Sequence, residues 1–237
     1  MIGWVPLALL ALVAPALPSD PRLGPVRAEL AQIVEQAAQS ELPAEALVVK
    51  VQEGLAKNVP AARIVAVVRG LAQDLGAARA FAAPLLAGGK PSPVLLRALA
   101  DAKAAGVSWN DATPLVRLGG EGPVRALRVL TDLATRGYPT DHAAAIVAAL
   151  AARDPQALPR LAADLDRVRR TRGLTQLETL DALQRALDRG RDVGAGALDR
   201  ALQKVDDGSA AGAPGQSGLE HGRGPNRDTS GHHGKKP

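Results

Sequence analysis

The sequence contains no cysteine and very few aromatic residues: two tryptophans, one tyrosine and one phenylalanine among 237 residues. The absence of cysteine excludes disulfide bonds, cysteine-ligated metal sites and thiol catalysis. Strands favour aromatic and β-branched side chains, so the shortage of aromatics also argues against a sheet. A core without large rings has to be built from smaller side chains.

Alanine, leucine and valine supply most of the hydrophobic residues, which make up 46% of the sequence. Alanine and leucine favour helices because they lose little rotamer freedom there. No stretch alternates convincingly between polar and apolar residues, as a half-buried strand would. The sequence therefore predicts an all-α protein. We expect antiparallel helical hairpins with alanine-lined contacts, packed as an irregular bundle or a short α-solenoid-like array.

An apolar run at residues 5–17 is shorter than the roughly 20 residues that span a bilayer. Ala14 and Ala16 place small side chains where a signal peptidase reads them. This pattern is typical of a secretory signal peptide, residues 1–16, although no basic residue precedes the run. A retained N-terminal anchor and a misassigned start codon are the alternatives. We expect an exported protein, periplasmic or extracellular.

Helix start and stop signals recur through residues 17–205, which we interpret as a helical domain. A serine-proline pair at 92–93 predicts an N-cap and a first helical residue. Thr175 with Glu178 predicts a capping box. Residues 206–237 are rich in glycine, serine, proline and aspartate and almost free of large apolar side chains, which predicts a disordered tail.

Three stretches share one layout, in which a helix is followed by glycine or asparagine, a hydrophobic residue and a second helix. The corner pairs are Asn58-Val59, Gly106-Val107 and Gly137-Tyr138. Such a residue suits a left-handed C-cap, and the hydrophobic residue can fold back onto the preceding helix. A fourth copy near Gly190 is weaker. The spacing is irregular, so both repeat ancestry and simple convergence of helical hairpins stay open.

The segment 42–64 resembles a segment of uncharacterised exported bacterial proteins. The residues that carry the resemblance are Leu42-Pro43, Glu45, Leu47, Lys50, Glu53-Gly54, Lys57, Pro60 and Arg63-Ile64. The resemblance implies no activity. The spacing itself predicts ion pairs from Glu53 to Lys57 and from Lys50 to Glu53. Glycine inside a helix is costly, so Gly54 predicts close approach by another helix.

Residues that could carry chemistry are sparse. His142 is the only histidine before residue 206, and no nucleophile elbow accompanies it. The glycines and lysine at 87–90 lack the spacing of a phosphate-binding loop, which favours a plain linker. The tail histidines have no fixed geometry for a metal. We therefore predict no catalytic residue, no cofactor and no resident metal, with an unrecognised hydrolase using His142 as the enzymatic alternative.

Four arginines gather at the end of a predicted helix: Arg167, Arg169, Arg170 and Arg172. They offset the negative end of the helix dipole, or they form a patch for an anionic partner. The charges of the predicted tail balance, so the net charge of +5 belongs to the helical region. No aromatic side chains lie nearby to stack bases, which disfavours nucleic acid.

The leading hypothesis is a non-enzymatic helical interaction or scaffold protein of the cell envelope, whose partner is an envelope protein. It is motivated by helical hairpins, an export signal and the missing catalytic constellation. The alternative from a different class is binding of an anionic polymer or membrane surface through the four arginines. Steep weakening of that binding by salt would mark this alternative.

Overall fold

The computed structural model describes residues 15–86 and 88–189, and in these ranges the chain forms helices and turns without any strand. The α-helices are α1 (Arg27–Gln39), α2 (Ala44–Ala56), α3 (Ala61–Ala82), α4 (Pro93–Ala104), α5 (Trp109–Val116), α6 (Gly122–Thr135), α7 (Thr140–Arg153), α8 (Leu161–Arg172) and α9 (Gln176–Asp188). Three short 3₁₀ helices are η1 (Pro21–Val26), η2 (Ala83–Leu85) and η3 (Leu158–Arg160). The predicted all-α class is confirmed. Most of the predicted signal peptide, the corner near Gly190 and the predicted tail lie outside the described residues.

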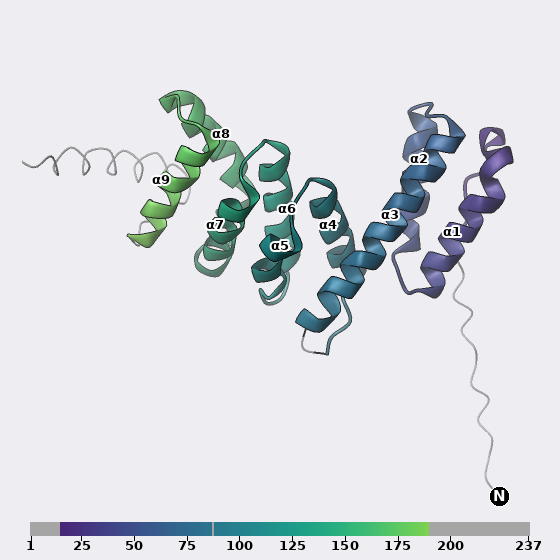
Figure 1. Ribbon diagram of the computed structural model, residues 1–237, viewed down its shortest axis with the longest axis horizontal. Coiled ribbons are helices and arrows are strands. Elements are labelled where there is room, and N and C mark those ends of the chain that lie inside the picture. The colour runs from purple at the N-terminus through teal and green to yellow at the C-terminus, as the bar shows by residue number, and fades with distance from the viewer. Residues whose placement is uncertain (1–14, 87, 190–237) are drawn as a thin grey trace, which may run out of the picture.

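The helices stand side by side in an elongated array of antiparallel hairpins (Figure 1). In the second half of the array, α4, α6 and α8 pack in succession in one row, and α5, α7 and α9 pack in a second row. The longest described helix, α3, packs against α1, α2 and α4, so it joins the N-terminal hairpins to the rest. Contacts of this kind, mainly between neighbouring hairpins, are typical of solenoid-like proteins.

Five corners between helices share one backbone motif. The residues of positive φ that end the helices are Glu41, Asn58, Gly106, Gly137 and Gly173. At each corner the amide of the next, hydrophobic residue donates to the carbonyl five residues earlier, at 2.9–3.1 Å. This is the hydrogen bond of a Schellman motif. The three strong corners that the sequence predicts are confirmed, and Val107 and Tyr138 are buried as expected.

The core is built from leucine, valine and alanine. Each described α-helix contributes a leucine with no exposed surface: Leu30, Leu47, Leu75, Leu99, Leu115, Leu127, Leu150, Leu165 and Leu183. Ala78 and Ala82 of α3 are also fully buried. Two aromatic residues pack against each other, where Phe81 stacks on Trp109 with ring centroids 4.6 Å apart. No described helix is long and apolar enough to cross a membrane.

Two predicted caps are confirmed. The Ser92 hydroxyl accepts a hydrogen bond from the Leu95 amide at 3.2 Å. Thr175 and Glu178 form the capping box at the start of α9. At the start of the array the chain forms η1 before α1 begins at Arg27. The Asp20 carboxylate caps η1 by accepting from the Arg22 amide, so the first turn begins before Pro25.

Candidate partner-binding hollow

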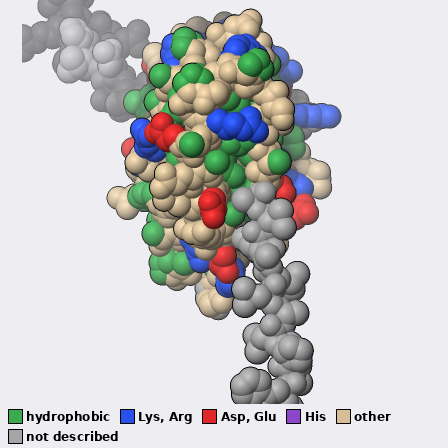
Figure 2. All heavy atoms as spheres, turned by 90° about the vertical axis from the view of Figure 1, so that its right-hand side faces the viewer, with side chains coloured by type: hydrophobic (Ala, Val, Ile, Leu, Met, Phe, Trp, Pro, Cys, Tyr) green, Lys and Arg blue, Asp and Glu red, His purple; other side chains and the backbone are tan. Residues whose placement is uncertain are grey.

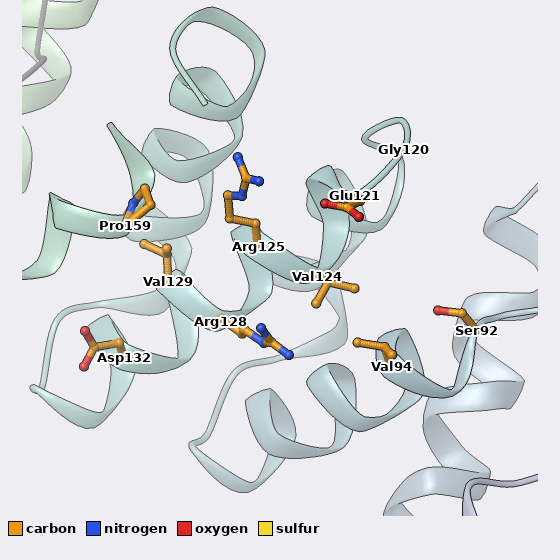
Figure 3. Close-up of a pocket in the computed structure, with 10 residues that line it drawn as sticks. All are labelled: Ser92, Val94, Gly120, Glu121, Val124, Arg125, Arg128, Val129, Asp132 and Pro159. Carbon is orange, nitrogen blue, oxygen red and sulfur yellow. The ribbon is translucent and has the colours of Figure 1, made fainter. Parts of the chain in front are cut away.

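A hollow of about 690 Å³ lies between the start of α4, helix α6 and η3 (Figure 3). Its lining residues are Ser92, Val94, Gly120, Glu121, Val124, Arg125, Arg128, Val129, Asp132 and Pro159. A volume of this size accommodates several side chains of a ligand.

Helix α6 supplies most of this lining because it is amphipathic. One side carries buried residues, among them Ala126, Leu127, Leu130 and Leu133. These positions recur with the three- and four-residue spacing of one helix face, and Val124, Arg125, Arg128 and Asp132 lie outside that set and line the hollow. Arg125 and Arg128 are three residues apart and are therefore neighbours on that second face.

The arginines of the hollow have no ion-pair partner among the residues that the structure describes. Neither Arg125 nor Arg128 forms an ion pair there. Asp132, which shares the hollow, is occupied by Arg136, whose Nε donates to Asp132 Oδ1 at 2.8 Å and whose Nη2 donates to Oδ2 at 3.1 Å. In Figure 3 the Arg128 side chain extends towards Val94 of α4. The hollow thus offers two guanidinium groups to a ligand, beside the carboxylate of Glu121, which forms no ion pair with a described residue.

Apolar side chains line the hollow beside these charges. Val94 is 53% exposed, which is unusual for a large hydrophobic side chain in this molecule. Val124 is half-buried, Val129 is nearly buried and Pro159 is exposed. Guanidinium groups bind carboxylates through paired hydrogen bonds, and apolar walls bind apolar side chains. The chemistry therefore suits a ligand that combines acidic and apolar groups.

The predicted arginine patch lies on α8 and is partly neutralised there. Arg167 Nη2 lies 2.8 Å from Asp164 Oδ1, and Arg169 Nε lies 3.7 Å from Asp166 Oδ1. Arg172 also has an interaction partner. Arg170 is exposed. The four arginines share the last turns of one helix, and the proposal of an anionic partner at this patch stays a prediction.

Asp166 is the centre of a buried polar cluster that joins the α6–α7 corner to α8. Its carboxylate accepts hydrogen bonds from Arg136 Nη1 at 2.6 Å and from the Tyr138 hydroxyl at 3.0 Å. Burial alone would raise the pKa of Asp166, but the hydrogen bonds from Arg136 and Tyr138 outweigh it and lower that pKa. Hydrogen bonds to Asp132 and then Asp166 raise the pKa of Arg136. Arg136 and Asp166 therefore stabilise each other's charged forms, which favours a structural role for the cluster.

Other predicted residues fall at the surface or in turns. His142 is exposed in the first turn of α7, and the described ranges contain no cluster of histidine and carboxylate residues that could hold a metal. Gly88 has positive φ in the link between η2 and α4, and Lys90 pairs with Glu41 at 3.0 Å. This arrangement agrees with a plain linker.

The predictions made for segment 42–64, which covers α2 and the start of α3, are confirmed in part. Glu53 pairs with Lys50 at 2.7 Å, as expected. The expected pair with Lys57 does not form, and the charge of Lys57 acts on Glu53 only at longer range. Gly54 does permit a close approach, because a Cβ atom there would lie 2.8 Å from Ile64 Cγ1.

No family model, curated protein or solved structure matches this chain. The candidate hollow is therefore defined by its own residues. The sequence reasoning missed Arg125 and Arg128, although their spacing on the polar face of a predicted helix was a usable signal.

Proposed function

We propose that this protein is a non-enzymatic helical interaction protein of the cell envelope. In this proposal the α4–α6–η3 hollow holds an acidic, partly apolar segment of a partner protein. The observation that carries the proposal is the pairing of two arginines, which form no ion pair with a described residue, with an apolar wall made by exposed Val94 and half-buried Val124. Solenoid-like arrays bind partners along such extended surfaces.

The envelope location rests on the N-terminal sequence pattern. One structural observation is compatible with cleavage after Ala16: the Leu17 and Pro18 carbonyls both accept hydrogen bonds from Arg27, at 3.3 and 2.9 Å. Residues that would follow the cleavage site therefore already contact the helical array. Residues 1–14 lie outside the described residues.

A defined peptide tests the binding proposal. The probe is a fluorescent peptide of alternating leucine and glutamate, and its matched control has glutamine in place of glutamate. We expect the full chain to bind the acidic peptide, and the double substitution Arg125→Glu with Arg128→Glu to weaken Kd by about tenfold or more, because like charges would then face each other. Fluorescence anisotropy at low and high salt measures this effect.

A charge-matched control separates the hollow from net charge. Arg117→Glu with Arg185→Glu makes the same change in charge at two exposed positions outside the hollow. We expect this control to change Kd by less than about threefold, because salt screens the interaction between the bound peptide and exposed charges outside the hollow. Equal weakening by both variants, or tighter binding to heparin or anionic vesicles than to the peptide, would contradict the proposal.

A further inference from the structure

A second hollow of about 300 Å³ lies between α2 and α3. Its lining residues are Lys50, Glu53, Gly54, Lys57, Val59, Arg63, Ile64 and Val67. Val67 lies on α3, and its side chain is 45% exposed. Ile64 packs closely against Gly54, where a Cβ atom would lie 2.8 Å from Ile64 Cγ1, so the floor of this hollow is apolar.

The rim of the second hollow carries excess positive charge. Lys50 and Glu53 neutralise each other at 2.7 Å. Lys57 and Arg63 are both exposed and form no ion pair with a described residue. The second hollow therefore repeats the chemistry of the α4–α6–η3 hollow, with two basic groups without ion-pair partners beside an exposed valine.

Helix α4 contributes a residue to the first hollow and a nearby charge to the second. The floor of the second hollow is formed by the start of α3, and α3 packs against both α2 and α4. The pKa of Glu53 is lowered first by the hydrogen bond from Lys50 and, among smaller causes, by the charge of Arg97 on α4. The first hollow is lined by Val94 of that same helix. Val94 and Arg97 lie within one turn at the start of α4, so neighbouring positions of this helix line the first hollow and act on the charged rim of the second.

We propose that the α2–α3 hollow is a second subsite for the same acidic partner segment, so that one extended chain with two acidic-apolar clusters crosses α4 and fills both hollows. This inference rests on the proposed function. It specifies the ligand further, because a partner with a single acidic cluster would use only part of the surface. Linking two weak subsites raises affinity through effective concentration without any new kind of contact.

Peptides with one or two clusters test this inference. The two-cluster peptide joins two leucine-glutamate clusters by a glycine-serine linker of about eight residues. We expect it to bind the full chain at least about tenfold more tightly than the one-cluster peptide. Lys57→Glu with Arg63→Glu should remove most of this gain, as should Arg125→Glu with Arg128→Glu. The neutral pair Lys57→Gln with Arg63→Gln repeats the test with a smaller perturbation, and circular dichroism checks that each variant is folded.

The outcomes separate this inference from the proposed function. If the substitutions at Lys57 and Arg63 leave the affinity of the two-cluster peptide unchanged while those at Arg125 and Arg128 weaken it, the second subsite is wrong and the proposed function stands. If neither pair changes the affinity, both are wrong. Loss of binding to anionic vesicles but not to the peptides, on substitution of Lys57 and Arg63, would assign this rim to a lipid surface and overturn the inference.

Discussion

Tyr138 and Asp166 show how a chain with few polar core residues uses them. The tyrosine follows the left-handed Gly137 at the α6–α7 corner, and its hydroxyl reaches the buried Asp166 carboxylate of α8 at 3.0 Å. Arg136 of the same corner donates to that carboxylate as well. One corner thus anchors the next hairpin through directional bonds, which fix the position of α8 more narrowly than leucine contacts would.

This cluster gives a pH dependence with a definite sign. Burial and the hydrogen bond to Asp166 raise the pKa of Tyr138 to about 12, against about 10 in an unfolded chain. The folded state therefore binds the proton of the Tyr138 hydroxyl more tightly than the unfolded state does. The resulting stabilisation of the folded state is complete below about pH 10 and is lost as the pH rises through about 12. The lowered pKa of Asp166 acts in the opposite direction, since its contribution is lost as the pH falls below about 4.

Because Tyr138 is the only tyrosine, tyrosinate absorbance reports on it alone. We expect a titration midpoint near 12 in the folded protein, shifted to about 10 in denaturant. Tyr138→Phe should remove the corresponding fall in the free energy of unfolding at alkaline pH. Absorbance titrations paired with urea unfolding measure both, with circular dichroism following the fold. Equal midpoints with and without denaturant would show that the hydroxyl is not held by Asp166.

Sequence reasoning at the residue scale found charge but not its surroundings. Arg167 and Arg169 are conspicuous in the sequence because they lie in a run of basic residues. In the structure, each lies beside an aspartate of its own helix. Arg125 and Arg128 stand out less and have no such partners among the described residues. Whether an arginine is neutralised depends on which side chains a helix face meets, and tertiary packing decides that. Composition cannot supply this information.

At the scale of elements, the corner is the unit that the sequence specifies best. In the sequence, a glycine followed by a hydrophobic residue is a local signal for a corner. This signal predicts the corners at Gly106 and Gly137 correctly, since both glycines have positive φ. Glu41 gives no such signal, because a residue with a Cβ atom adopts positive φ only at a cost. Its corner is held by the amide of Leu42, which donates to the Ala37 carbonyl at 2.9 Å.

Substitution at a corner should therefore cost more than substitution at an ordinary turn. Gly106 has φ of +89°, and Gly106→Ala should lower the free energy of unfolding by about 1 kcal/mol through backbone strain alone, since open space surrounds the position. Gly119→Ala is the matched control, because Gly119 also faces open space but lacks positive φ. Urea unfolding of both variants measures the difference. Equal effects would show that the left-handed conformation does not limit this corner.

At the scale of the whole molecule, the centre of the array is packed against more helices than its two ends are. Helix α6 packs against α4, α5, α7 and α8, whereas α1 and α9 each meet fewer helices. The Arg153 guanidinium, which donates to the Leu187 carbonyl at 2.7 Å, is one of the bonds that hold α9. In quasi-one-dimensional proteins the end units open first, because each depends on a single neighbouring interface.

Hydrogen exchange tests this gradient. We expect amides in α9 and α1 to exchange at least about tenfold faster than those in α6 under native conditions, since end hairpins open without unfolding the centre. Mass spectrometry of peptic fragments measures these rates. One common rate for the slowest amides of all three helices would mean that the array unfolds as a single cooperative unit.

The sequence predicts the helical class and the hairpins from local signals, but the order of packing in the array depends on α3. At 22 residues it is long enough to pack against α1, α2 and α4. The length of this helix is hard to predict because Gly70 and Gly76 lie inside it, and either glycine could mark a helix end. The hollow beside α6 is formed by this packing. For that reason, neither the order of packing nor the hollow could be predicted from the sequence.

The position of α3 also bears on how the chain acquires its structure. Once α2 and α3 have closed on each other, the free end of α3 offers a finished surface to α4, and each later hairpin meets a neighbour that is already complete. No pairing has to wait for a distant part of the chain, so the search involves short loop closures and is fast for the length of the molecule. Assembly can therefore proceed from one end to the other, in the order in which the residues are made.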